Sequence, residues 1–244
     1  NIFRIYPKNH SLIISSHMVQ ISVLCAELKR NEWIRQTYFD HFLAALRTQF
    51  LPDDVQVELS TMYHVVCYQR ITEATTLCEQ AGVCVPAEIT EWRRRILKAS
   101  ACYLLPNGEV AAFNDGKMSG SVDAIGRKDD CLKDIILREG PSLGIEEGLA
   151  IASHGKKGNM TAPFSHALPF AGHFILRDGL EPSSMALGFD AGPFGTAHAH
   201  EDALTIILVS GGKTLLMDIG SGAYDPACPM RLYSTSTESH STLC

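Results

Sequence analysis

The hydrophobic pattern changes its period near the middle of the chain, and this change is the strongest constraint on the fold. Up to about residue 105, apolar residues recur every three to four positions, which is typical of helices. After about residue 165, the apolar residues form short runs separated by glycines, which is typical of strands. The sequence therefore predicts an α+β protein in which a helical region precedes a β region.

The individual elements follow from these patterns. Helices are expected over residues 11–28, 41–51, 58–82 and 86–105. Strands are expected over residues 173–179, 184–192 and 203–220, and the last run contains a hairpin turn at Gly211-Gly212. The strands are almost continuously apolar, so we expect burial on both faces, as in two stacked sheets. Residues 116–165 show weak periodicity and are expected to connect the two regions.

The composition excludes several classes of protein. No run of eighteen apolar residues occurs, which excludes a transmembrane helix. A net charge of −6 argues against a dedicated nucleic-acid binder. The short basic clusters at residues 92–98 and 154–157 are interpreted as a solvated helix face and a loop.

The cysteines and the chain ends carry less information. The eight cysteines form no CxxC pair, and Cys25, Cys67 and Cys102 lie in apolar stretches where they are expected to act as small core residues. The chain begins at Asn1 rather than at a methionine and stops at Cys244 without a turn signal. We interpret it as a fragment of a longer protein.

The stretch "GPFGTAHAHEDALT", residues 192–205, places two histidines immediately before an apolar run. On an extended strand, His198 and His200 would point to the same face. Asp218 follows the next predicted strand and His240 lies near the end of the chain. Imidazole and carboxylate groups are common zinc ligands, but polar residues at strand ends are also common without a metal.

Strand geometry tests the idea of a metal site. A tight turn at Gly211-Gly212 would pair Asp218 with Thr205, which leaves about 17 Å of strand between Asp218 and His200. A shared metal ion therefore requires a bend or bulge around residues 200–203, or a different pairing.

The helical region contains two further polar groups. Asn9 and His10 stand at the start of one predicted helix, and Glu58, Ser60 and Tyr63 open another. Taken separately, both groups are typical of helix caps and first-turn polar residues.

Together, these segments resemble the heparinase II/III-like polysaccharide lyases, a family that includes oligoalginate lyases. The matching stretches, in order, are "NHSL", "VELSTMYH", "PNGEVAAFNDG", "GHFILRDG", residues 189–225 and "MRLYSTSTESHST". The resemblance implies a partial α/α toroid over residues 1–115, a connecting segment over 116–165 and a truncated antiparallel β-sandwich domain over 166–244. Two departures are that residues 113–120 are less acidic than the family's loop and that Ser241 replaces an asparagine.

The resemblance also implies an activity and a role for each candidate residue. The activity is cleavage of a uronic-acid-containing polysaccharide by β-elimination, in the periplasm or outside the cell. The implied catalytic residues are Asn9, which neutralises the substrate carboxylate, His10 beside it, and the acid–base pair Tyr63 and His198. The implied ligands of a structural zinc ion are His200, Asp218 and His240. The implied partner is an acidic polysaccharide or oligosaccharide, with no nucleic acid and no membrane span.

Other classes of protein remain as alternatives. A cupin-like metal protein would share the spacing from Gly192 to His198 and His200, but Leu204 and Thr205 stand where its motif needs a glutamate. A catalytically inactive, carbohydrate-binding relative would use the same cleft without turnover, but the presence of Asn9, Tyr63 and His198 argues against lost catalysis. A helical toroid also serves as an interaction scaffold. Ultraviolet absorbance distinguishes a lyase from these alternatives, because elimination leaves a conjugated, unsaturated uronate.

Overall fold

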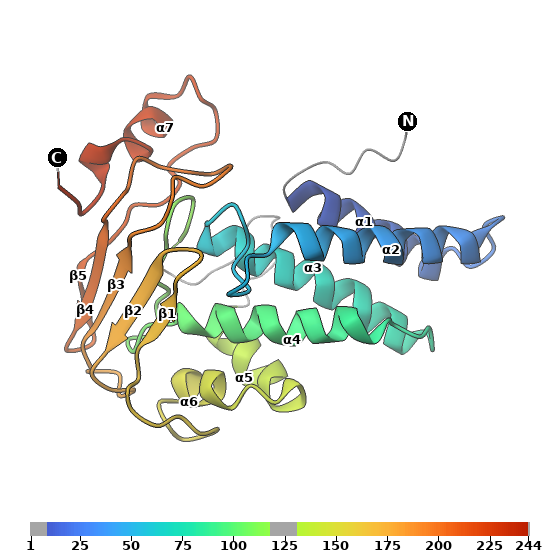
Figure 1. Cartoon of the computed structure of the whole chain (residues 1–244), viewed down its shortest axis with the longest axis horizontal. Helices are drawn as coiled ribbons and strands as arrows, with labels where there is room; N and C mark the ends of the chain where they lie inside the picture. The colour runs from blue at the N-terminus through green and yellow to red at the C-terminus, as the bar shows by residue number, and fades with distance from the viewer. Residues whose placement is uncertain (1–8, 118–130, 244) are drawn as a thin grey trace.

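The computed structural model describes residues 9–117 and 131–243. Residues 118–130 of the predicted connecting segment and the first eight residues of the predicted helical region lie outside the described residues. Figure 1 shows a layer of helices lying against one side of a β-sheet. The predicted α+β class is confirmed.

The first four helices correspond to the four predicted ones. They are α1 (Asn9–Leu24), α2 (Asn31–Gln49), α3 (Thr61–Gln80) and α4 (Ala87–Cys102). Helix α1 packs on both α2 and α3, and α3 packs on α4. As the most buried of the four, α3 places apolar side chains on several faces, including the consecutive residues Val65, Val66 and Cys67. This central position explains why its sequence is apolar over a wide arc.

The predicted connecting segment contains two helices that the sequence pattern did not indicate. Helices α5 (Leu132–Leu143) and α6 (Glu146–Ser153) pack on each other and on α4. Pro141 lies within α5 and glycines stand on both sides of it, which breaks the local periodicity. Because α6 is only eight residues long, its period is too short to detect.

The β region forms one antiparallel sheet with its strands in sequence order (Figure 1). The strands are β1 (His166–Leu168), β2 (His173–Arg177), β3 (Ala186–Asp190), β4 (Ile206–Ser210) and β5 (Lys213–Leu216). Gly211 and Gly212 form the two-residue turn between β4 and β5 at φ 59° and 75°, which confirms the predicted hairpin. Two short elements, α7 (Pro229–Ser234) and a 3-10 helix (Thr237–Ser239), follow the sheet.

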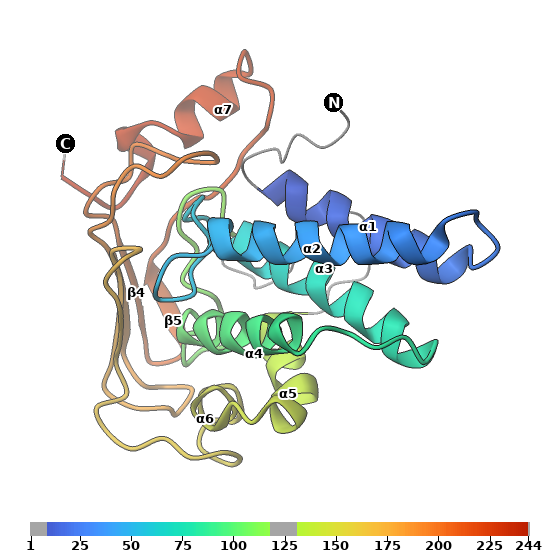
Figure 2. The same cartoon turned by 45° about the vertical axis from the view of Figure 1, so that its right-hand side comes forward.

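The described residues bury one face of this sheet, whereas the sequence predicted burial of both. Ile175, Ala186, Ile207 and Val209 alternate with less buried residues and belong to the same core as the helices. The opposite face is also apolar, and Leu176 on it is 51% exposed. Figure 2 shows that the helical layer covers the sheet from one side. The continuous apolar pattern is therefore real, but within the described residues only one face is covered.

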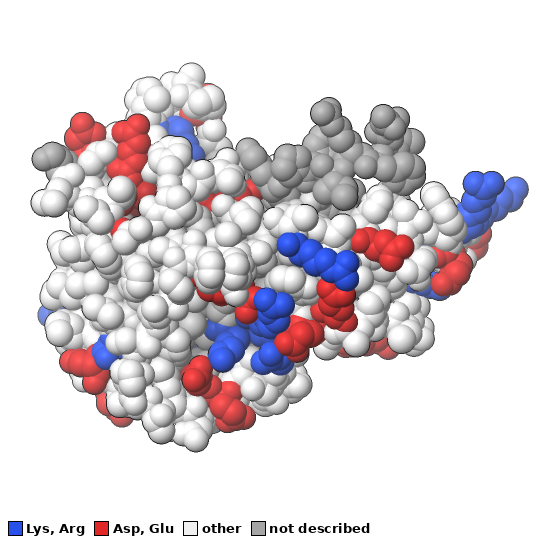
Figure 3. Space-filling view, viewed as in Figure 1, with Lys and Arg blue, Asp and Glu red and all other residues white. Residues whose placement is uncertain are grey.

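The interpretation of the basic cluster at residues 92–98 is confirmed. Arg94 pairs with Glu91 at 2.6 Å and Lys98 with Glu147 at 3.6 Å, both at exposed positions. On the face shown in Figure 3, basic and acidic side chains alternate over the helices instead of forming an area of one sign. Arg93 is an exception, since its side chain is largely buried against Glu139.

Three smaller expectations can also be checked. Cys67 and Cys102 are buried as predicted, whereas Cys25 is only half-buried. The basic stretch at residues 154–157 is a turn that follows α6. Among the described residues, no helix combines the length and the apolar character needed to cross a bilayer.

Candidate active site and metal site

Tyr63 lies in the first turn of α3, where the helical layer meets the sheet. Its ring stacks on that of His198, with 3.6 Å between the ring centroids and 17° between the planes. Burial raises the pKa of Tyr63 well above its ordinary value, and a hydrogen bond with Tyr224 and the charges of Asp115 and Glu58 raise it further. Tyr63 is therefore protonated at neutral pH.

Asn9 begins α1 and is held by Glu58, which is completely buried. The Asn9 side-chain amide donates to Glu58 Oε2 at 2.9 Å, and the Asn9 backbone N–H donates to Glu58 Oε1 at 3.2 Å. Glu58 Oε2 also lies 3.9 Å from His198 Nε2. Asn9, Glu58, His198 and Tyr63 thus form one group, although 54 positions separate Asn9 from Tyr63 along the chain.

His10 is placed differently from the other candidates. It is exposed on α1. No polar or ring contact between described residues joins it to Tyr63 or His198. The structure therefore brings together three of the four candidate catalytic residues.

The stretch around His198 and His200 is a loop that bends, so the geometry of an ideal extended strand does not apply to it. His198 has φ 58° and Leu204 has φ 65°, and both values lie in the left-handed region. The Thr205 backbone N–H donates to the Asp202 carbonyl at 2.9 Å, which closes a turn immediately before β4. The bend that a shared metal ion requires is therefore present, and the simple strand register does not apply to His200.

This bend brings together the three candidate metal ligands. Ligand atoms of His200, Asp218 and His240 all lie within 4.8 Å of one another, and all three residues are buried. Asp218 Oδ2 is 2.6 Å from His240 Nδ1. His200 Nδ1 and His240 Nε2 are buried and have no hydrogen-bond partner. Two unpartnered imidazole nitrogens beside a carboxylate fit a bound metal ion.

The charge around this triad also favours a cation. Two more buried carboxylates, Asp190 and Asp202, lie near Asp218. Burial raises the pKa of Asp190 to about 7, and the charges of Asp202 and Asp218 add to this shift. Oδ2 of Asp202 is buried without a hydrogen-bond partner. A metal ion would offset this concentration of negative charge.

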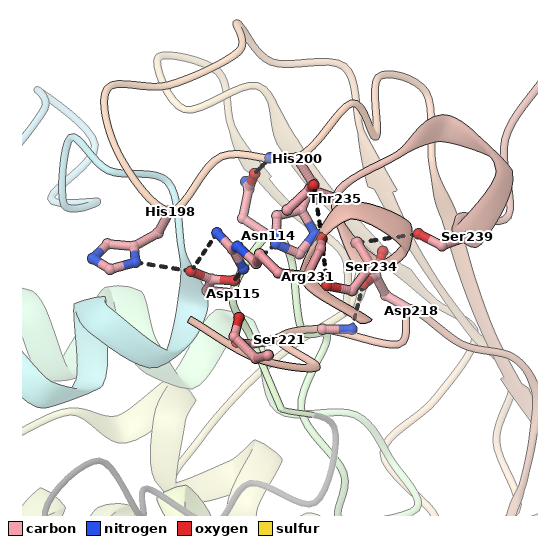
Figure 4. A network of polar contacts seen from close by, with 12 residues as sticks. Asn114, Asp115, His198, His200, Asp218, Ser221, Arg231, Ser234, Thr235 and Ser239 are labelled. Carbon is pink, nitrogen blue, oxygen red and sulfur yellow. Dashed lines mark hydrogen bonds and ion pairs between the residues drawn. The ribbon is translucent and has the colours of Figure 1, made fainter. Parts of the chain in front are cut away.

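Asp115 is the site residue to which sequence reasoning gave no role. Its carboxylate accepts from His198 Nδ1 and from His200 Nε2, both at 2.8 Å, and it is paired with Arg231 (Figure 4). Burial alone would raise the pKa of Asp115, but the hydrogen bonds from these residues hold it well below its ordinary value. The available signal was the stretch "PNGEVAAFNDG", which contributed to the family resemblance without a function.

The neighbouring Asn114 ties the same loop to both layers. Its side-chain oxygen accepts from the His200 backbone N–H at 2.8 Å, and its amide donates to the Leu59 carbonyl at 3.2 Å. Leu59 lies two residues before α3 begins. The loop therefore fixes the segment that carries His200 relative to the start of the helix that carries Tyr63.

The protein thus consists of a helical layer packed on an antiparallel sheet, and polar residues from both meet at the junction. This combination can be compared with known protein families. The family described as heparinase II/III N-terminus matches residues 3–128. The family described as heparinase II/III-like, C-terminal, matches residues 160–244. The chain belongs to the heparinase II/III-like family.

Individual relatives agree with this assignment. The heparin-sulfate lyase of Pedobacter heparinus is 22% identical over 240 residues, which cover 96% of this chain and 35% of that protein. A crystal structure of a heparan sulfate lyase mutant from Pedobacter heparinus aligns with a TM-score of 0.76 at 23% identity, over 96% of this chain and 36% of that one. A heparinase III structure aligns with a TM-score of 0.78 at 22% identity, over 98% of this chain and 37% of that one. The chain thus spans about a third of the length of these relatives.

Proposed function

We propose that this chain carries the catalytic residues of a polysaccharide lyase that cleaves a uronic-acid-containing polysaccharide by β-elimination. The observation that supports it most is the stacked pair Tyr63 and His198, in which a helical residue meets one from the β region. Both rings are partly accessible, since His198 is 21% exposed and Tyr63 is half-buried. A proton donor and a proton acceptor in contact are the minimum that an elimination requires.

Asn9 is suited to the first requirement of the reaction. The proton next to a uronate carboxylate is weakly acidic, and it becomes removable when donors stabilise the enediolate that forms. The Asn9 amide has two hydrogens, and Glu58 accepts one of them. The second is left for the substrate carboxylate. By holding Asn9 from two sides, Glu58 fixes the direction of that donor.

Tyr63 and His198 supply the proton transfers. The raised pKa of Tyr63 keeps its hydroxyl protonated, which supports a role in donating to the departing glycosidic oxygen. His198 bonds to Asp115 through Nδ1, so its Nε2 faces Glu58 and the site. In the neutral form with the proton on Nδ1, Nε2 has a free lone pair and acts as a base. His10 is exposed beside Asn9. It would contact only a part of the substrate that extends past Asn9, Tyr63 and His198.

We further propose that the metal site binds zinc through His200, Asp218 and His240. Bound zinc would supply cross-linking of the loop before β4 to the segments after β5, without taking part in the elimination. The residues themselves support this, because His200 Nδ1 and His240 Nε2 are buried without another partner.

The substrate class follows from the relatives. Their printed names refer to heparin and heparan sulfate, so we propose a glycosaminoglycan of this type as the first substrate to test. Alginate and other uronic-acid polymers are the next. Because such polymers occur outside the cytoplasm, we propose a periplasmic or secreted location.

The experiment is an absorbance assay on protein produced from the complete reading frame, with each polymer supplied separately. Elimination creates a conjugated, unsaturated uronate, so ultraviolet absorbance should rise on one polymer. Tyr63→Phe keeps the ring and its stacking on His198 but removes the proton, and should lower kcat by about 10²–10⁴. Tyr38→Phe, at a half-buried tyrosine of α2 whose ring contacts His41, is the matched control and should keep full activity.

The outcomes separate the proposal from its alternatives. Binding of a polymer with no rise in absorbance would favour a catalytically inactive, carbohydrate-binding relative. A rise that persists in Tyr63→Phe would exclude the proposed role of that hydroxyl.

A further inference from the structure

Asp115 contacts a histidine of each proposed site, and no other carboxylate among the described residues is hydrogen-bonded to both histidines. Its Oδ2 accepts from His198 Nδ1, and its Oδ1 accepts from His200 Nε2, each at 2.8 Å. His198 belongs to the proposed catalytic group and His200 to the proposed metal triad. The Asp115 side chain is completely buried, so water does not compete for either oxygen.

We propose that Asp115 is a positioning residue that couples the metal site to the proposed catalytic histidine. The proposal rests on the proposed function for its kinetic part only. Asp115 sets the proton of His198 on Nδ1, and thereby directs Nε2 toward the reacting atoms. With its other oxygen it holds the proton of His200 on Nε2, which leaves Nδ1 free for the metal ion.

The hydrogen-bond pattern determines both proton positions. A carboxylate without a proton only accepts hydrogen bonds, so each histidine nitrogen that contacts Asp115 must carry a hydrogen. The unpartnered, buried Nδ1 of His200 is consistent with this assignment. A carboxylate that orients a metal-binding histidine in this way typically matters nearly as much as the ligand itself.

Arg231 holds the shared carboxylate in place. Its guanidinium contacts both oxygens of Asp115, at 3.2 Å from Nη2 to Oδ2 and in a closer contact from Nη1 to Oδ1. The side chain approaches from α7, as Figure 4 shows, so it contacts the carboxylate from a different segment than the two histidines. Two charged N–H groups in a fork fix the plane of the carboxylate as well as its charge.

The backbone holds the two histidines at the spacing that one carboxylate can span. The Asp115 backbone N–H donates to the His198 carbonyl at 3.2 Å, and the Asn114 side chain accepts from the His200 N–H. His198 itself has left-handed backbone geometry. This kink lets two residues at an i, i+2 spacing approach the same carboxylate by different ring nitrogens.

The test uses Asp115→Asn in the protein produced from the complete reading frame. Asparagine keeps the shape of the side chain but replaces one of the two oxygens by an N–H₂ group. One of the two histidine N–H groups then faces a donor and loses its hydrogen bond. We expect the affinity for Zn²⁺, measured by competition with a chelating dye, to fall about 10–100-fold. We expect kcat on the active polymer to fall by a similar factor while KM changes less than about twofold. Asp178→Asn is the matched control, since Asp178 is an exposed turn residue that accepts from the Met185 N–H.

A second measurement needs neither turnover nor a variant. In wild-type protein labelled with ¹⁵N-histidine, His198 Nδ1 should carry a proton, and its resonance should move when Zn²⁺ is added to metal-free protein. A bare Nδ1 on His198 would overturn the proposal, and so would a resonance that ignores Zn²⁺. Unchanged zinc affinity or unchanged kcat in Asp115→Asn would also overturn it. If no polymer is cleaved by wild-type protein, the proposed function fails, but zinc affinity and the histidine spectrum still decide the role of Asp115.

Discussion

His64 makes the stability of this protein depend on pH in a way that can be calculated. It follows Tyr63 in α3 and is 1% exposed. Nδ1 accepts from the Gln56 backbone N–H at 3.3 Å, and Nε2 lies 3.2 Å from the Ile96 carbonyl. Nε2 therefore carries the proton and the ring is neutral. Burial lowers the pKa of His64 from 6.5 to about 4.

The sign and size of the effect follow from the two pKa values. In the unfolded chain His64 takes up a proton below about pH 6.5, whereas in the folded protein it resists protonation down to about pH 4. The contribution of His64 to the free energy of unfolding is fully present above pH 6.5 and is lost as the pH falls toward 4. At about pH 5 the loss is about 2 kcal/mol of the free energy of unfolding.

The assay is urea unfolding of wild-type protein and of His64→Gln, followed by the fluorescence of Trp92. This buried tryptophan contacts Phe50, which also contacts the His64 ring. When the pH is lowered from about 7.5 to about 5, the free energy of unfolding should fall by about 2 kcal/mol more in the wild-type protein than in His64→Gln. His17→Gln, at an exposed position on α1, should behave as wild type. Equal losses in wild type and His64→Gln would refute the reasoning.

Two further variants test contacts around the site. Glu58→Gln should destabilise the protein by about 1.5–3 kcal/mol in urea unfolding, because its amide can accept from only one of the two Asn9 donors; no change would show that Asn9 is held by something else. In Gly220→Ala, the new Cβ would lie 2.0 Å from the Gly116 carbonyl oxygen, whereas Gly211→Ala, at nearly the same φ, meets nothing within 4 Å. The first should be less stable than the second by at least about 1 kcal/mol, and equal stabilities would contradict the close approach.

The elements with a long, uninterrupted period were predictable. Helices α1, α3 and α4 were expected with ends close to those observed, because each presents an apolar face over four turns or more. Helix α2 was expected from residue 41 but begins at Asn31. Strands β2 to β5 were expected because β-branched and aromatic residues are bounded by glycines. Helices α5 and α6 were not predicted. A proline and the neighbouring glycines interrupt the apolar period of α5, and α6 is too short to show one.

The candidate site was predictable only where a motif surrounds the residue. The residue pair His198 and His200 stands out in the sequence, and strand geometry indicates that a shared metal ion needs a bend there, but the backbone conformation that makes the bend could not be predicted. No local pattern predicts a left-handed residue at His198, because the conformation depends on contacts with the loop at Asn114 and Asp115. Asp115 was missed for the same reason, as its partners lie 83 to 116 positions away along the chain.

The electrostatics of the junction explain why these residues gather there. Glu58 and Asp115 are both buried carboxylates, and a buried charge requires compensation. For Glu58 the compensation is the start of α1, where the Asn9 N–H groups donate and the helix dipole is positive. For Asp115 it is Arg231 and the two histidines. Each carboxylate is thus balanced by donors from a distant segment. Glu58 ties the start of α1 to the segment before α3, and Asp115 ties the loop after α4 to the β region. In the proposed reaction, the same arrangement would offer already oriented donors to the carboxylate of an anionic sugar.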